Sequence, residues 1–308
     1  MKINSQAPSA VVMVRPHFFS PNQQTANDNV FQKQSTQPLS EVNQNAFNEV
    51  SSAIETLACA GVKVYAFDDK GTKTPDSVFP NNWFSSHGCG TLVIYPMYCE
   101  NRRLEVNPAV LSRLEDDFIV NKRVDYSDLA VRHKYLEGTG AMVLDHENKI
   151  AYAVRSKRMD EDVLQQFCQE LGFTPCIFGA SDDNNIPIYH TNVLMCVASD
   201  FVMIGLDMIK DKVERGLVSQ TISKTGKELI ELSTEQINNF AGNTLELNTQ
   251  TGKVLVMSQT AYDTLKQEQL TAIKQYVEIV VVSIPTIELA GGSIRCMIAG
   301  IHLKPKTH

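Results

Sequence analysis

The sequence lacks any run of lysine or arginine longer than a pair such as Arg102-Arg103. Its net charge is −7 and its isoelectric point is about 5.5, so it lacks the basic surface by which proteins bind nucleic acid or acidic membranes. No apolar stretch approaches the length of about 18 residues that a membrane span requires, and the first residues contain no apolar signal segment. We therefore expect a cytoplasmic protein whose partner is a small molecule, with no nucleic acid and no membrane.

The cysteines form no C-x-x-C pair, and their number, seven, is odd. This pattern suits neither a disulfide framework nor a zinc ribbon, so we expect reduced thiols. The short motif His87-Gly88-Cys89 is followed by no third or fourth ligand at a suitable spacing, which argues against a metal site. Tryptophan occurs once, as Trp83, which we expect to pack in the core.

A unit of about fifty residues repeats along the chain. It contains two short apolar strands, an amphipathic helix and a buried strand, and it begins near residues 83, 136, 190 and 243. Its first half returns near residue 290. The clearest copy has strands at 141–145 and 150–154, a helix with apolar residues between 163 and 171, and a further strand from 175. Helices are also predicted at 40–57, before a strand at 62–67, and after the capping box of Ser233 and Gln236.

Each unit leaves an apolar face that only a neighbouring unit can cover. We therefore predict an α/β fold in which successive copies close into a ring of blades, with strand ends and turns converging on a central axis. A chain of 308 residues with 43% hydrophobic content can form such a core, as one large domain or two. A site on the axis would draw its residues from several blades.

Polar residues recur just before the first strand of successive copies. They are Asn82, Glu137, His190 and Asn192, and Cys296 lies in the fifth, partial copy. Each of them alone has an ordinary explanation as a turn residue or a satisfied polar residue. Their joint occurrence at one phase of the repeat instead predicts an axial site.

Cys296 has the sequence surroundings of a nucleophile. It follows the glycine pair Gly291-Gly292 and the cation Arg295. Thiolate is the reactive form of cysteine and is favoured by nearby positive charge, while glycine lets the backbone approach a substrate closely. An isolated cysteine is more often a buried core residue, but the position of Cys296 in the repeat favours a reactive one.

Four motifs, in this order, resemble the guanidino-group modifying superfamily, which includes arginine deiminases, dimethylarginine dimethylaminohydrolases and amidinotransferases. They are Phe79-Pro80-Asn81-Asn82-Trp83, Leu136-Glu137-Gly138-Thr139-Gly140, His190-Thr191-Asn192-Val193 and Gly292-Ser293-Ile294-Arg295-Cys296-Met297. The resemblance covers most of the chain and is closest to the citrulline-utilisation hydrolase branch. It implies a five-bladed, pseudo-fivefold α/β propeller (a pentein), with residues 1–308 as a single catalytic domain and no metal or organic cofactor. It also implies that Cys296 is the nucleophile, His190 the general acid and base, and Glu137 the carboxylate that engages the planar nitrogen group of the substrate.

The chain departs from the superfamily at two positions. Members that act on arginine usually carry aspartate where this chain has Asn82 and Asn192, and the two carboxylates clamp the guanidinium cation. A buried guanidinium without carboxylate partners would cost several kcal/mol. A ureido group is neutral and combines a carbonyl acceptor with N–H donors, which an asparagine amide can match. We therefore expect Asn82 and Asn192 to bind a ureido amino acid, above all citrulline.

Two further segments are candidates for substrate contact. Arg158 resembles the position where deiminases carry an arginine for the substrate carboxylate, although an exposed arginine at a helix start fits the sequence equally well. Residues 18–35 begin with a polar stretch that lacks helical or strand periodicity, which suits either a lid over the site or a surface loop.

The expected reaction is the hydrolysis of citrulline to ornithine, ammonia and carbon dioxide through a covalent cysteine intermediate. An arginine deiminase, a dimethylarginine dimethylaminohydrolase or an amidinotransferase of the same superfamily remains an alternative, as does a catalytically silent binding protein on this scaffold. The sequence leaves open which nitrogen departs and whether the protein forms a homo-oligomer.

Overall fold

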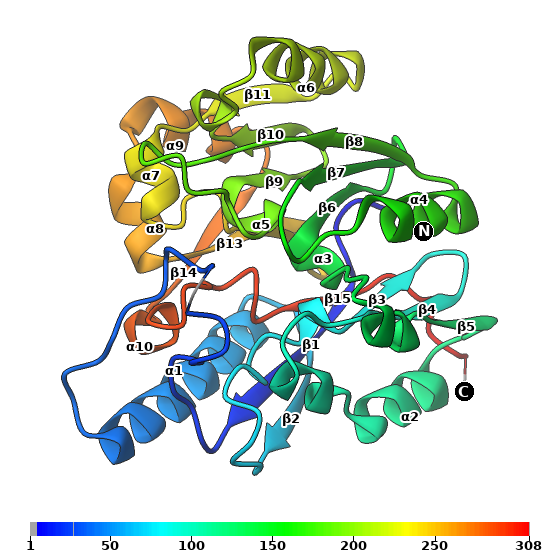
Figure 1. The fold of residues 1–308 in the computed structure, drawn as a ribbon, viewed down its shortest axis with the longest axis vertical. Coiled ribbons are helices and arrows are strands. Elements are labelled where there is room, and N and C mark those ends of the chain that lie inside the picture. Colours follow the sequence, from blue (N-terminus) through cyan, green and yellow to red (C-terminus); the bar gives the residue numbers. More distant parts are fainter. Residues whose placement is uncertain (1–4, 27, 308) are drawn as a thin grey trace.

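Five small sheets, each of three strands, surround a central axis (Figure 1). The computed structural model describes residues 5–26 and 28–307. Four sheets follow one another along the chain: β3 (Phe84–His87), β4 (Thr91–Ile94) and β5 (Lys122–Asp125); β6 (Met142–Asp145), β7 (Ile150–Val154) and β8 (Thr174–Phe178); β9 (Met195–Val197), β10 (Phe201–Ile204) and β11 (Glu228–Glu231); β12 (Leu245–Asn248), β13 (Lys253–Ser258) and β14 (Glu278–Val282). In each sheet the middle strand pairs antiparallel with the first strand and parallel with the last.

The fifth sheet joins the two ends of the chain and closes the ring. Strand β15 (Ala299–Ile301) pairs antiparallel with β1 (Ala10–Pro16), which pairs parallel with β2 (Lys63–Asp69). The half-copy of the repeat near residue 290 therefore finds its second half at the N-terminal end, where α1 (Leu39–Cys59) connects β1 to β2. The predicted five-bladed α/β propeller is confirmed.

A helical connection links the second and third strands of every blade. In the four blades that are continuous along the chain, these connections are α2 (Pro108–Asp117), α4 (Glu161–Leu171), α6 (Lys212–Lys224) and the pair α8 (Gln259–Thr264) and α9 (Gln267–Lys274). A further helix, α7 (Thr234–Asn238), follows β11 and leads to the next blade. The helix ends follow the sequence, since Asp160 caps the start of α4 and Gly172, at φ +71°, ends it. The capping box of Ser233 and Gln236 opens α7 as predicted. The fourth blade differs from expectation in having two short helices in place of one.

Two first strands begin later than the apolar pattern suggested. Ala141 lies in a helical turn, α3 (Gly138–Ala141), and Val193 lies in another, α5 (Thr191–Leu194). In α3 the backbone carbonyl of Glu137 accepts from two amides of the turn, so the chain turns once at the axis before it extends. Both turns are buried, and for this reason their apolar residues resemble those of a buried strand.

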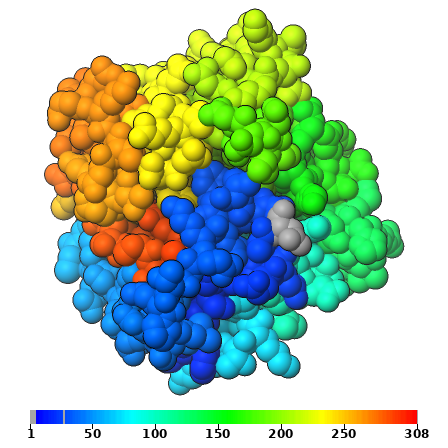
Figure 2. All heavy atoms as spheres, turned by 60° about the vertical axis from the view of Figure 1, so that its left-hand side comes forward, coloured from blue at the N-terminus to red at the C-terminus, as the bar shows by residue number. Residues whose placement is uncertain are grey.

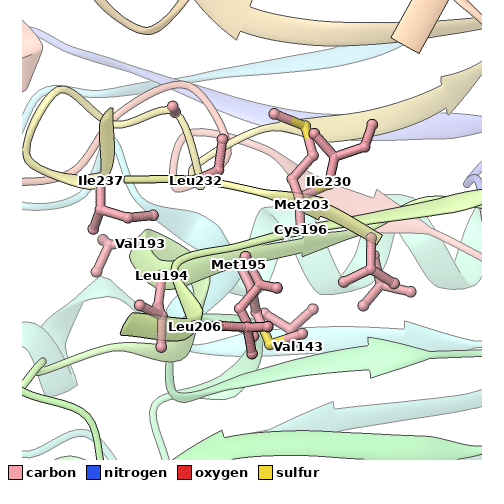
Figure 3. Close-up of a cluster of buried hydrophobic side chains, with 14 of the residues drawn as sticks. Val143, Val193, Leu194, Met195, Cys196, Met203, Leu206, Ile230, Leu232 and Ile237 are labelled. Carbon is pink, nitrogen blue, oxygen red and sulfur yellow. The ribbon is translucent and has the colours of Figure 1, made fainter. Parts of the chain in front are cut away.

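The core is divided into clusters between neighbouring blades. The largest packs the second, third and fourth blades together, and Figure 3 shows part of it around β9 and β10 with Leu194, Met203 and Ile237. Trp83 is buried beside Phe84 in another cluster, as expected. No helix in the described part of the chain is long and apolar enough to cross a bilayer. The remaining short helical turns are α10 (Pro285–Glu288), η1 (Pro80–Asn82), η2 (Asn101–Glu105), η3 (Ser127–Arg132) and η4 (Leu206–Met208). Of these, η1 and η2 contribute residues to the site described next.

Candidate active site

The predicted site residues meet at the axis, at the ends where the first strands begin. A narrow cavity of about 10 Å³ is lined there by Asn82, Arg158, His190 and Cys296. Glu137 and Asn192 adjoin it, because Glu137 contacts His190 and Asn192 contacts Cys296. All six predicted residues are thus together, although they span more than 200 positions of sequence.

Glu137 and His190 form a buried pair. Nε2 of His190 lies 2.8 Å from Oε2 of Glu137, and the other carboxylate oxygen accepts from the backbone amide of Tyr98 at 3.0 Å. Guanidinium nitrogens of Arg158 and Arg102 lie 3.4 and 3.6 Å from the same Oε2. The carboxylate therefore faces protein partners on several sides, and with Nε2–H donating to it the imidazole keeps Nδ1 as its free acceptor.

The electrostatics of this pair define its protonation. Burial alone would raise the pKa of Glu137, but Arg158, the hydrogen bond from His190 and Arg102 together hold that pKa below its usual range. Burial lowers the pKa of His190 to about 4, against the opposing hydrogen bond and charge of Glu137. At neutral pH the pair is therefore a carboxylate and a neutral imidazole, a state in which His190 can accept a proton.

Cys296 lies among amide donors. Nδ2 of Asn192 is 3.4 Å from Sγ, and Nδ2 of Asn243 is 3.3 Å from it. Asn243 also donates to the backbone carbonyl of Asn192 at 2.7 Å and accepts from the amide of Arg295 at 3.1 Å. The thiol of Cys296 in turn lies 3.7 Å from Oδ1 of Asn192, so the two amides fix the position of Sγ beside the cavity.

Asn82 presents an N–H group to the site. Arg102 donates to its Oδ1 at 2.8 Å, and because guanidinium can only donate, the amide oxygen must face Arg102 and the NH₂ group must face away. Arg102 is in turn held by both oxygens of Glu105, at 2.9 Å each. Nδ2 of Asn82 is buried and has no hydrogen-bond partner among the described residues. A buried donor without a partner is costly, which marks this atom as a ligand contact.

Gly140 makes room for Asn82 and His190. A Cβ at position 140 would lie 2.2 Å from Nδ2 of Asn82 and 2.8 Å from Nδ1 of His190. The two nitrogens therefore flank the same point beside the cavity. No side chain larger than hydrogen fits there without moving one of them.

Gly140→Ala should reduce turnover about 100-fold, because a displacement of about 1 Å in a reacting or binding group has an effect of that size. The fold should persist, since the clash involves two site side chains and not a left-handed backbone. Gly216→Ala is the matched control: Gly216 lies within α6 and a Cβ there meets no atom within 4 Å. Steady-state kinetics and circular dichroism would check both variants. Equal activity of the two would contradict this placement of Asn82 and His190.

His190 should make the folded state sensitive to acid. Its pKa is about 4 in the folded protein against an ordinary 6.5, so between these values the unfolded chain binds a proton that the folded protein does not. Its contribution to stability is complete above pH 6.5 and is lost as the pH falls toward 4, with a slope of about 1 kcal/mol per pH unit. Urea unfolding of His190→Gln should show a shallower loss of stability over this range than the wild type. Identical slopes would show that His190 is not buried in its neutral form.

A covering segment, described at residues 19–26 and 28–31, lies over the cavity. Phe19 and Phe31 are buried in two different core clusters, and between them Thr25 and Asn29 line the cavity. Asp28 binds the guanidinium of Arg158 through both oxygens, at 2.7 and 3.0 Å. Figure 2 shows the segment in blue across the middle of this face, between the blades. Arg158 is therefore buried, and the alternative of an exposed arginine at a helix start is wrong.

Gly291 fixes where this covering segment lies. Its φ is +77°, and a Cβ there would meet the side chain of Asn29 at 2.4 Å. Asn29 also donates to the carbonyl of Ala290 at 2.9 Å. The glycine before the Cys296 loop is therefore required by the close approach of the covering segment.

Sequence reasoning missed three residues of this site. Asn243 lies two residues before the first strand of the fourth blade, β12, at the same phase as Asn82 and Glu137, so the repeat itself contained the signal. Arg102 and Asp28 lie outside that phase, in η2 and in the covering segment. Nothing in the local sequence distinguishes them from surface charges.

The ring of five blades and its axial cysteine, histidine and carboxylate define a protein of the guanidino-group modifying superfamily. A sequence profile of the family described as N,N dimethylarginine dimethylhydrolase, eukaryotic, matches residues 15–303. The chain belongs to this family. No curated protein sequence matches the chain significantly.

Solved structures support the fold. ArgZ, an arginine dihydrolase from the ornithine-ammonia cycle in cyanobacteria, superposes with a TM-score of 0.72 at 15% identity, over 96% of this chain and 41% of ArgZ. Unliganded AgrE gives 0.74 at 17% identity, over 97% of this chain and 40% of AgrE. A variant of dimethylarginine dimethylaminohydrolase bound to S-methyl-L-thiocitrulline gives 0.63 at 11% identity, over 96% of this chain and all of that one. The chain thus spans about two fifths of ArgZ and AgrE.

Proposed function

We propose that this protein hydrolyses the ureido group of citrulline, with Cys296 as the nucleophile, to ornithine, ammonia and carbon dioxide. The observation that carries the proposal is the orientation of Asn82. Its oxygen is bound by Arg102 and its unpartnered N–H group lies beside the cavity. An N–H donor pairs with the carbonyl oxygen of a ureido group, whereas a guanidinium has only N–H groups and would oppose donor to donor.

The charges around the cavity favour the same substrate. Asp28 is bound to Arg158, Glu105 to Arg102, and Glu137 to His190 and both arginines. Asp76 accepts from Asn22 and lies 3.7 Å from Arg102, and burial raises its pKa. A guanidinium substrate would be a third buried cation beside two arginines and would have to take a carboxylate from one of them. A neutral ureido group requires no such exchange.

The reaction follows from these positions. The proton of the Cys296 thiol first passes to the free Nδ1 of His190. Sγ then attacks the ureido carbon, and Asn82 donates to the carbonyl oxygen as negative charge develops on it. The bond to the alkyl nitrogen breaks, the departing amine of ornithine takes a proton from His190, and a carbamoyl-cysteine remains. His190, neutral again, accepts a proton from water as it attacks this intermediate. Carbamate leaves, Cys296 is restored as a thiolate, and carbamate decomposes to ammonia and carbon dioxide.

Four residues take supporting roles in this mechanism. Glu137 orients His190 and stabilises its protonated form, since its carboxylate contacts the imidazole and not the cavity. Asn192 and Asn243 hold the thiolate through their amide groups. Arg158 binds the α-carboxylate of the substrate in the same fork that holds Asp28. Asp28 must then release Arg158 when the substrate enters, which links substrate binding to movement of the covering segment.

A guanidino substrate is the second candidate. The family is named for dimethylarginine, AgrE has been crystallised with L-arginine, and ArgZ is an arginine dihydrolase. On such a substrate the same cysteine would expel an amine or ammonia from the guanidino carbon. The orientation of Asn82 is the observation that opposes it.

Binding to an inactivated enzyme separates the two candidates. Cys296→Ala should bind citrulline more tightly than arginine in calorimetry, by about tenfold or more. With arginine bound, the N–H group of Asn82 would face N–H groups of the guanidinium and stay unpaired, at a cost of more than about 1 kcal/mol. Cys168→Ala, a buried thiol of α4, keeps the nucleophile and serves as a control that turns substrate over. Tighter binding of arginine would overturn the ureido proposal, and binding of neither ligand would overturn both candidates.

A further inference from the structure

A second cavity lies on the axis, farther along the same first strands that begin at the active site. Its volume is about 40 Å³. All five blades contribute to its wall, through β3, β6, β9, β15 and the start of β12. The wall is polar at several points, with Gln6, Ser86, His146, Arg295 and His302 among its residues. The mechanism uses none of these side chains.

Arg295 is the only arginine or lysine that lines this wall. Its guanidinium forms no ion pair with a carboxylate among the described residues. Its one side-chain hydrogen bond among residues 5–26 and 28–307 goes to the backbone carbonyl of Ile298, at 3.0 Å. The two buried arginines, Arg102 and Arg158, are each bound by both oxygens of a carboxylate, whereas Arg295 is partly buried. Burial lowers the pKa of Arg295. Burial acts in the same direction on Arg102 and Arg158, but the neighbouring carboxylates raise the pKa of each of these two arginines above its ordinary value. Arg295 is thus a partly buried cation whose remaining N–H donors have no hydrogen-bond partner among the described residues.

The rest of the wall contains no compensating charge. Not one of its seventeen residues is aspartate or glutamate, in a protein with 35 acidic residues. The residues outside the described set, 1–4, 27 and 308, contain no acidic side chain either. Carboxylates are compatible with a solvent-filled pore, and a cation site would require them. Their absence from the wall therefore favours a site for an anion.

Two imidazoles complete a polar corner near Arg295. His146 and His302 stack with ring centroids 3.9 Å apart, and both line the cavity. No hydrogen bond from either ring to another side chain occurs among the described residues. Neutral imidazoles can each donate one N–H group to an anion that Arg295 holds.

We propose that this axial cavity binds a small oxyanion, of the size of bicarbonate or phosphate, with Arg295 as its counter-ion and His302 and His146 as further donors. The proposal does not depend on the substrate of the active site. Bicarbonate would come from the carbon dioxide that the proposed reaction releases, whereas phosphate would come from the surroundings. The two sources share the chemistry of a planar or tetrahedral oxyanion on a guanidinium fork.

Calorimetric titration of the full-length protein tests this. Potassium bicarbonate and potassium phosphate are titrated in an oxyanion-free buffer, with potassium chloride at equal ionic strength as the reference. We expect saturable binding of at least one oxyanion, with an affinity at least tenfold lower in Arg295→Gln. Arg158→Gln, which removes the arginine of the other cavity, should bind within twofold of the wild type. Binding of bicarbonate alone would identify the product as the source, and binding of phosphate would identify the external ion.

Three results would overturn the proposal: no oxyanion binds more tightly than chloride, Arg295→Gln binds as well as the wild type, or Arg158→Gln abolishes binding. If Arg295→Gln does not fold, His302→Ala takes its place, because His302 is only partly buried near the end of the chain. Its affinity should fall at least threefold. Anomalous scattering from arsenate, a phosphate analogue, should then show the ion beside Arg295 in a crystal, and an ion found only at Arg158 would also contradict the assignment.

Discussion

Cys296→Ala should lower the rate of ornithine release from citrulline by about 10⁴-fold or more, because removal of a nucleophile abolishes the covalent route. The protein should remain folded. The hydrogen-bond contacts of the thiol are long, at 3.4 and 3.7 Å to the amide of Asn192 and 3.3 Å to that of Asn243, and alanine leaves a small cavity. Discontinuous measurement of ornithine, together with a thermal unfolding curve, would check both statements.

A matched substitution separates catalysis from packing. Cys168→Ala removes an equally buried thiol from α4 and should change turnover by less than about twofold while costing comparable stability. If Cys296→Ala retained more than a few per cent of wild-type activity, a covalent intermediate at this residue would be excluded.

Asn82→Asp should have the second-largest effect and should act on specificity. The new carboxylate would pair with Arg102, which now donates to the amide oxygen at 2.8 Å, and would turn an acceptor toward the cavity in place of a donor. The kcat/KM for citrulline should fall about 10²- to 10³-fold, which is typical for loss of one donor to a developing oxyanion. Binding of arginine should strengthen at the same time, since a carboxylate can pair with its guanidinium.

The control for this variant is Asn48→Asp, which makes the same change of charge on the exposed face of α1. It should leave both substrates unaffected. Parallel losses for citrulline and arginine in Asn82→Asp would show that Asn82 is only structural, and an unchanged kcat/KM for citrulline would remove the basis of the ureido proposal.

The fold was predictable because its hydrophobic pattern is repeated. One copy of the unit is ambiguous, but the recurrence of strand, strand, helix and strand at a period of about fifty residues defined the blades and their closure. The two ends of the chain share the fifth blade, so the half-copy near residue 290 and the helix at Leu39–Cys59 belong together. The first strands were placed early at Ala141 and Val193, because a buried helical turn and a buried strand have the same apolar composition.

The site was predictable only where it follows the repeat. Asn82, Glu137, His190, Asn192 and Cys296 occupy one phase of the blades, and Asn243 shares that phase but was overlooked. The orientation of the Asn82 amide could not be predicted, since it depends on Arg102 in η2, twenty positions away.

The hydrogen bonds between Asp28 and Arg158 join residues that are 130 positions apart in the sequence. No local sequence pattern predicts them. Contacts of this type arise when a loop folds across the ring, and they depend on the length and anchoring of that loop. Phe19 and Phe31 anchor it here, which only the assembled core reveals.

The central claim is that the site processes a neutral ureido group. Purified protein should be incubated with citrulline and with arginine in parallel, with ornithine, citrulline and ammonia quantified and Cys296→Ala as the blank. We predict that citrulline yields equal amounts of ornithine and ammonia, that the blank yields neither, and that arginine is turned over at least tenfold more slowly. Faster turnover of arginine than of citrulline, with activity lost in the blank, would contradict the account and establish a guanidino hydrolase instead.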